Sequence, residues 1–165
     1  MNISQFTSEE LRSYVYFLLN VVRRADGFWF LGAENTCSYP AAIRINEEVW
    51  HRMARIMTRE IKERFSIQEK GLEGLVKVLR YFPWAIIMGY QVETKDEKII
   101  VSVPHCLSQE ARIRQGLGEY DCKNMHYGAF RNIVEEVDKD IKIECLFAPP
   151  EPHPKELFCK WHFTI

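Results

Sequence analysis

The sequence has no excess of either charge and no segment of extreme composition. Lysine and arginine number 22 against 23 acidic residues, and the formal net charge is -1. A nearly neutral chain lacks the basic surface with which proteins neutralise nucleic-acid phosphates, so we expect no nucleic-acid partner. Hydrophobic residues make up 47% of the chain, a share that is typical of globular proteins and argues against disorder.

The sequence also lacks long apolar runs and targeting segments. The most apolar stretch near the N-terminus, residues 14–22, contains Asn20 and is too short to cross a bilayer. A secretory signal would need a basic segment, an apolar run and small residues at a cleavage point, and this pattern is missing. We therefore expect a cytoplasmic protein with no membrane partner. In a reducing compartment its five cysteines would be thiols or metal ligands rather than disulfides.

No repeat, low-complexity tract or linker rich in proline, glycine and serine divides the chain. Its 165 residues suffice for one hydrophobic core, so we predict a single domain over residues 1–165. The catalytic motifs GxSxG and HExxH, a phosphate-binding loop and a dinucleotide fingerprint are also missing. Whether the protein is an enzyme stays open at this point.

The first half of the sequence has the apolar spacing of helices. Residues 7–24, 40–65 and 71–81 each carry apolar side chains three and four positions apart. Pro40 is well placed to begin the second of these helices. The aromatic segment 26–31 predicts a break after the first.

The second half changes to the alternating pattern of strands. Residues 86–92 and 99–103 predict a hairpin, and two further strands follow at the C-terminal end, over 141–147 and 159–165. Two helices, 106–115 and 122–137, lie between these pairs of strands. The sequence therefore predicts an α+β fold: N-terminal helices packed on a C-terminal antiparallel sheet of about four strands, with two intervening helices.

Four cysteines fall in this second half, at positions 106, 122, 145 and 159. Cys145 and Cys159 are in phase with the apolar residues of two strands that we expect to pair. Cys106 and Cys122 begin helices, where the helix dipole lowers thiol pKa values and favours thiolates. Four thiolates could hold a structural zinc ion, which prefers tetrahedral sulfur ligation. The alternative is four reduced cysteines that pack as small apolar residues, because no CxxC pair is present.

A family resemblance adds to this pattern. The stretches C-L-S-Q-E-A-R-x-R-x-G-L-x-x-Y-x-C, I-E-C, P-P-E-P-H-P and F-C-K-W-H-F-T-I resemble a family of uncharacterised prokaryotic cytosolic proteins. That family is similar to the L-2-amino-thiazoline-4-carboxylic acid hydrolases. The C-terminal half more distantly resembles sensor domains of the four-vinyl-reductase type. The sensor resemblance implies zinc ligation by Cys122, Cys145 and Cys159, with Cys106 or Glu110 as the fourth ligand.

These observations lead to two functional hypotheses. The first is a cytosolic small-molecule-binding domain, stabilised by a structural zinc site. The alternative is a hydrolase acting on a small cyclic C–N substrate, as the hydrolase resemblance implies. In either case a small-molecule ligand would contact the candidate pocket residues Trp29, Trp50, Tyr90, Glu110 and His126. A purely structural subunit, marked by exposed apolar patches, is a third role, and a homodimer is one assembly that it could form.

Overall fold

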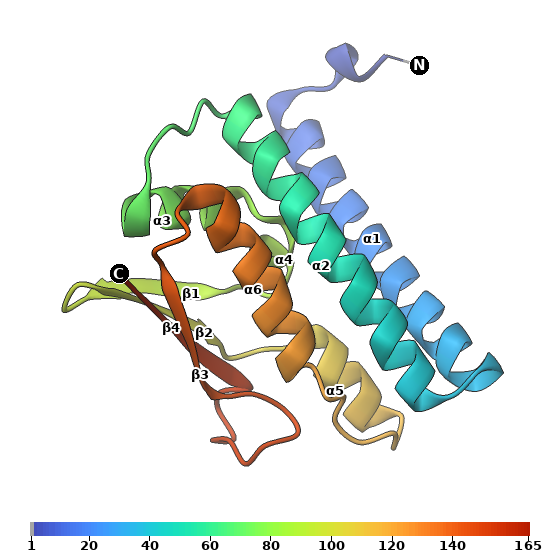
Figure 1. Cartoon of the computed structure of the whole chain (residues 1–165). Helices are drawn as coiled ribbons and strands as arrows, with labels where there is room; N and C mark the ends of the chain where they lie inside the picture. The colour runs from blue at the N-terminus through green and yellow to red at the C-terminus, as the bar shows by residue number, and fades with distance from the viewer. Residues whose placement is uncertain (1) are drawn as a thin grey trace. The chain divides into compact units, whose positions relative to one another are not determined.

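The computed structural model describes residues 2–165 as a series of helices followed by an antiparallel sheet (Figure 1). The elements in chain order are a 3₁₀ turn (Ile3–Gln5), α1 (Ser8–Thr36), α2 (Tyr39–Arg64), α3 (Gly71–Tyr81), α4 (Pro83–Ile87), β1 (Gln91–Lys95), β2 (Lys98–Val103), α5 (Leu107–Arg114), α6 (Lys123–Val137), β3 (Lys142–Phe147) and β4 (Cys159–Thr164). The predicted α+β class is confirmed. The chain divides into two compact units, one ending at Ala42 and one beginning at Ile43. The predicted single domain stays a prediction.

The first unit consists mainly of α1. Thr7 begins this helix with a capping box, in which its hydroxyl accepts from the Glu10 backbone N–H and the Glu10 carboxylate accepts from the Thr7 N–H. The helix continues through residues 26–31, so the predicted break there is wrong. The segment contains no proline, and a single glycine, Gly27, costs a helix only about 1 kcal/mol.

The second unit contains a four-stranded antiparallel sheet with the order β1-β2-β4-β3. The C-terminal strand β4 is therefore central, with Trp161 opposite Val101 on β2 and Phe163 opposite Ile143 on β3. The predicted pairing of the last two strands is confirmed. The predicted first strand, 86–92, is displaced: β1 begins only at Gln91 and continues to Lys95, because Pro83 begins a short helix, α4, that takes up the first of the alternating residues.

One face of this sheet is buried under helices α3 and α6 (Figure 1). Trp161 and Phe163 are fully buried, and the ring of Phe130 on α6 meets each of them edge-on, at 5.3 and 5.1 Å between centroids. From α3, Leu75 and Val78 join the same cluster. This core holds the starts of α5 and α6 and the end of the sheet in fixed positions, and the predicted cysteine site lies there.

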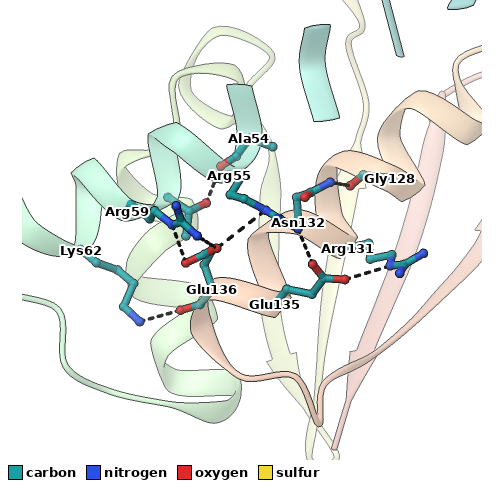
Figure 2. Close-up of polar contacts among 10 residues, drawn as sticks. Ala54, Arg55, Arg59, Lys62, Gly128, Arg131, Asn132, Glu135 and Glu136 are labelled. Atoms are coloured by element: carbon teal, nitrogen blue, oxygen red, sulfur yellow. Dashed lines mark hydrogen bonds and ion pairs between the residues drawn. The ribbon is translucent and has the colours of Figure 1, made fainter. Parts of the chain in front are cut away.

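Helices α2 and α6 are joined by ion pairs (Figure 2). Arg59 donates two hydrogen bonds to the Glu136 carboxylate, at 2.9 and 2.7 Å, a bidentate geometry. Arg55 pairs with Glu135, and Lys62 donates to the Glu136 carbonyl oxygen at 2.7 Å. The Glu136 side chain is 20% exposed and the Arg59 side chain 65% exposed, so this pair lies at the surface, where solvent screens it.

Replacing Glu136 tests this pair. The hydrogen bond from Arg59 favours the ionised Glu136 carboxylate and lowers the pKa of Glu136. The pair therefore stabilises the fold above the ordinary carboxyl pKa, and this stabilisation is lost as the pH falls through the lower pKa of the folded state. We expect Glu136→Gln to lower the free energy of unfolding at pH 7 by about 1 kcal/mol. The difference from the wild type should shrink as the pH falls and vanish once Glu136 is protonated in the folded state. Urea unfolding at several pH values measures both, with the exposed Glu63→Gln as the control.

The same two helices approach closely where His51 meets Gly128. The His51 Nε2 atom lies 3.3 Å from the Asn124 carbonyl oxygen and 3.2 Å from that of Met125, so an Nε2–H donates to the first turn of α6. A methyl group at position 128 would overlap with the His51 ring. Only glycine therefore fits at this position while the histidine keeps its place.

We expect Gly128→Ala to lower the free energy of unfolding by about 1–3 kcal/mol, the usual cost of overpacking. The double variant with His51→Ala should recover part of this loss. Gly27→Ala is the matched control, because nothing lies within 4 Å of the added methyl group there and alanine favours the helix. Equal effects at positions 27 and 128 would contradict the close approach.

Candidate functional site

The structure brings the predicted cysteine ligands near one another. Cys106 is the N-cap residue of α5, Cys122 is that of α6, and Cys159 begins β4. These three thiols are close enough to influence one another's ionisation, and Cys145 is close enough to raise the pKa of Cys159. Cys145, on the edge strand β3, is only half-buried and lies near Lys123 and Glu151.

Burial keeps these thiols protonated, whereas the positions of Cys106 and Cys122 at helix N-termini predicted thiolates. It raises the pKa of Cys122 far above the ordinary thiol value, and it also raises the pKa of Cys106. The pKa of Cys159 rises to about 12, again because of burial. Desolvation therefore outweighs the helix dipoles, and these groups are neutral thiols at pH 7.

The cysteines do not assemble into a metal site. Within residues 2–165, no group of three or more His, Cys, Asp or Glu side chains is arranged to hold a metal ion. The Cys122 sulfur instead accepts a hydrogen bond of 3.4 Å from the buried side chain of Gln109. Glu110, the alternative fourth ligand, faces His105 at 3.5 Å and Arg114 at 3.8 Å. The structure therefore contradicts the predicted function as a zinc-stabilised domain and favours cysteines that serve as packing residues.

Gln109 is a structural residue that the sequence analysis missed. Its side-chain amide donates to the Tyr120 carbonyl oxygen at 2.7 Å, and its carbonyl oxygen accepts from the Tyr120 N–H at 2.8 Å. This pair of hydrogen bonds fixes the loop between α5 and α6 and so places Cys122. No local pattern marks a buried glutamine, because its partner is eleven residues away.

The predicted ligand-binding residues are dispersed. Tyr90 and His126 both contact the ring of Phe130, at 6.5 and 6.1 Å between centroids. Trp50 packs instead on Trp84, with centroids 4.9 Å apart. Glu110 lies on α5 in the ion pairs described above. Trp29 lies on α1 and is 81% exposed, so it lines no interior pocket.

His126, a candidate pocket residue, is poorly suited to act as a general base. Burial lowers its pKa to about 4, so the ring is neutral at pH 7. A base of this pKa accepts a proton weakly near neutral pH, where general bases work best with a pKa near 7. Its contacts with Phe130 and Trp161 are those of an aromatic core residue.

The most prominent surface feature is an apolar face on α1. Not one of the helix's 29 residues, all of them described by the structure, is fully buried. Positions separated alternately by four and three residues form an apolar seam, consisting of Leu11, Val15, Leu18, Val22, Ala25 and Trp29. All six are exposed, Leu18 by 41% and Val22 by 49%. This spacing keeps the side chains on one face and is typical of helices that pair with another helix.

Large apolar side chains, two of them aromatic, extend the seam on one side. Tyr14, Val21 and Phe28 flank it, and Phe28 is 72% exposed. Near the start of the helix, a shallow hollow is lined by Phe6, Glu10, Ser13, Tyr14 and Phe17. The Tyr14 ring forms one wall, with the Phe6 ring edge-on at 5.4 Å and the Phe17 ring stacked at 6.0 Å. The sequence analysis placed Trp29, at the end of the seam, in a ligand pocket, because a helical period does not reveal what covers an apolar face.

Comparisons with known proteins add a family and a fold. The model of a family of unknown function (DUF6125) matches residues 10–165. No curated protein matches the chain. A solved structure of trafficking protein particle complex subunit 3 from Naegleria fowleri, covalently bound to palmitic acid, matches with a TM-score of 0.55 and 12% identity, over 90% of this chain and 95% of that one. At this identity the likeness concerns the fold.

These findings correct the functional hypotheses. The structural neighbour is a subunit of a trafficking complex, which points away from both a zinc-stabilised small-molecule-binding domain and a hydrolase of cyclic C–N substrates. Both hypotheses are therefore wrong. The resemblance to aminothiazoline hydrolases and vinyl-reductase sensors stays a prediction. In the part of the chain that the structure describes, no helix is both long and apolar enough to cross a membrane.

The burial of the thiols predicts their reactivity. With Ellman's reagent at pH 8, we expect the exposed Cys37 to react fast and the half-buried Cys106 and Cys145 to react more slowly, while the buried Cys122 and Cys159 react only after unfolding, because reaction needs an accessible thiolate. Cys37→Ser should remove the fast phase and leave the melting temperature unchanged. A second fast phase in native protein that disappears in Cys122→Ser would contradict the assignment of Cys122 to the core.

Proposed function

Because this chain belongs to a family of unknown function (DUF6125), its role has to be inferred from its own structure, and we propose that it is an assembly subunit that forms a homodimer through α1. The observation that carries this proposal is the apolar seam of α1 with its aromatic flank, which lies exposed on the single chain. Large contiguous apolar surfaces are rare on proteins that act as monomers and mark sites of association.

The charge of α1 favours a protein partner over a lipid surface. The helix carries three arginines, at positions 12, 23 and 24, against four acidic residues, at positions 9, 10, 26 and 34. Helices that lie on membranes are rich in lysine and arginine on their polar face, because anionic lipids attract them. A helix with a slight acidic excess has no such attraction.

The spacing of the seam favours a helix as the surface that covers it. Side chains that alternate by four and three residues interlock with the same pattern on a second helix. The seam, from residue 11 to residue 29, extends about 27 Å along the helix axis, enough for several layers of interlocking side chains. A second copy of this chain supplies a helix of matching length and pattern, and twofold dimers are the commonest protein assemblies. The fold neighbour is itself, by its name, a subunit of a complex.

Replacing a seam residue tests the proposal. We expect the wild-type protein to have twice the single-chain mass of 19.5 kDa in light scattering at micromolar concentrations and above. Leu18→Glu should give the single-chain mass, because the dimer would bury two carboxylates without partners. Its helical content and melting temperature at low concentration should match those of the wild type, since Leu18 is exposed in the single chain.

Tyr16→Glu is the matched control. Tyr16 is on the same helix and is 61% exposed, but the helical rotation of 100° per residue places it far from the seam. This variant should associate like the wild type. The proposal fails if the wild-type protein keeps the single-chain mass up to about 100 µM, because specific dimers form at that concentration. Dissociation by both variants alike would also refute it, because the seam would then have no special role.

A further inference from the structure

We propose that the two α1 helices pair antiparallel, with Leu18 of each copy opposite Val22 of the other and Arg12 of each beside Asp26 of the other. This inference rests on the proposed homodimer and specifies its geometry. It follows from three features of α1: the sizes of the seam residues, the positions of two charges, and the hollow near the start of the helix.

The sizes of the seam residues match best when the helices run in opposite directions. The antiparallel register then places Leu11 opposite Trp29, Val15 opposite Ala25, and Leu18 opposite Val22. Each layer combines a larger with a smaller side chain. A parallel dimer would instead place Trp29 against Trp29 and Ala25 against Ala25, so these two neighbouring layers would differ in size more than the Leu11–Trp29 and Val15–Ala25 layers of the antiparallel register. Underfilled layers lose contacts and destabilise an interface.

The charges beside the seam also favour the antiparallel orientation of the two helices. Arg12 and Asp26 lie on the same side of the seam, fourteen residues apart. In the antiparallel register Arg12 of one copy comes level with Asp26 of the other, and the twofold symmetry forms this pair twice. In a parallel dimer the two charges stay about 21 Å apart along the axis. Opposite charges at such flanking positions select the orientation of paired helices.

The hollow on α1 receives a side chain in this arrangement. Phe28 of the second copy comes level with residue 12, on the flank where Tyr14 forms a wall of the hollow. Its exposed ring would then cover the hollow and contact the Tyr14 ring. The same flank brings Val21 of each copy together at the twofold axis. The antiparallel register therefore covers the large apolar side chains at both ends of the helix.

Disulfide trapping distinguishes the two orientations. Val15→Cys and Ala25→Cys are conservative in the seam, because cysteine packs like a small apolar residue. Both are made in a Cys37→Ser background, which removes the exposed native thiol. In the antiparallel dimer, only the double variant should form a covalent dimer under mild oxidation. In each single variant the two thiols would be about 15 Å apart along the axis, beyond the reach of a disulfide.

The outcomes separate this inference from the proposed function. A covalent dimer of the double variant, with none from either single variant or the background, supports the antiparallel register. Efficient covalent dimers of each single variant would overturn it in favour of a parallel dimer and leave the homodimer intact. Wild-type protein of single-chain mass would remove both proposals.

A charge-reversal cycle tests the Arg12–Asp26 contact separately. We expect Arg12→Glu and Asp26→Arg each to raise the dimer dissociation constant about tenfold, because each variant replaces two attractive pairs with repulsive ones. The double variant should return to within about threefold of the wild type. Additive weakening in the double variant would overturn the contact. Sedimentation equilibrium at low salt, where surface charges are least screened, is the measurement.

Discussion

The burial of strand β4 is the constraint on which the second unit depends. Trp161 and Phe163 lie on the central strand of the sheet and are fully covered, with Phe130 of α6 edge-on to both. A strand near the end of the chain thus stands between two others, and the helices before it fold onto its buried face. The ion pairs of α2 with α6 and the contact between His51 and Gly128 add α2 to the same core.

The cysteines show how this core overrides local chemistry. Cys106 and Cys122 begin helices, where the dipole alone would favour thiolates, yet burial raises their pKa values. The free-energy cost of removing a thiolate from water exceeds the stabilisation that a helix N-terminus provides, unless a metal ion or another cation compensates. The described residues offer no such metal site, and Gln109 donates a hydrogen bond to the Cys122 sulfur instead. Neutral thiols within a hydrophobic core are the consistent result.

Helix α1 presents the opposite situation. The second unit buries most of its sheet and α3 residues in one core, although Ile45, Val49 and other apolar side chains stay exposed, whereas every residue of the α1 seam is exposed on the single chain. In the proposed homodimer, the same hydrophobic effect that folds the sheet acts between chains at α1. The complementary sizes of Trp29 and Leu11 and the opposite charges of Arg12 and Asp26 are the features that would give this association a direction.

The sequence by itself determined the α+β class, most helices and the pairing of the last two strands, because these depend on local periods and on capping and turn residues. It could not decide whether residues 26–31 break α1, or whether Pro83 ends one helix or begins another, since propensity differs little between those outcomes. Only the tertiary structure decided what the cysteines and Trp29 do. Periodicity shows that a side chain lies on an apolar face, but whether that face meets the core, a metal ion or another chain depends on residues far away in the sequence.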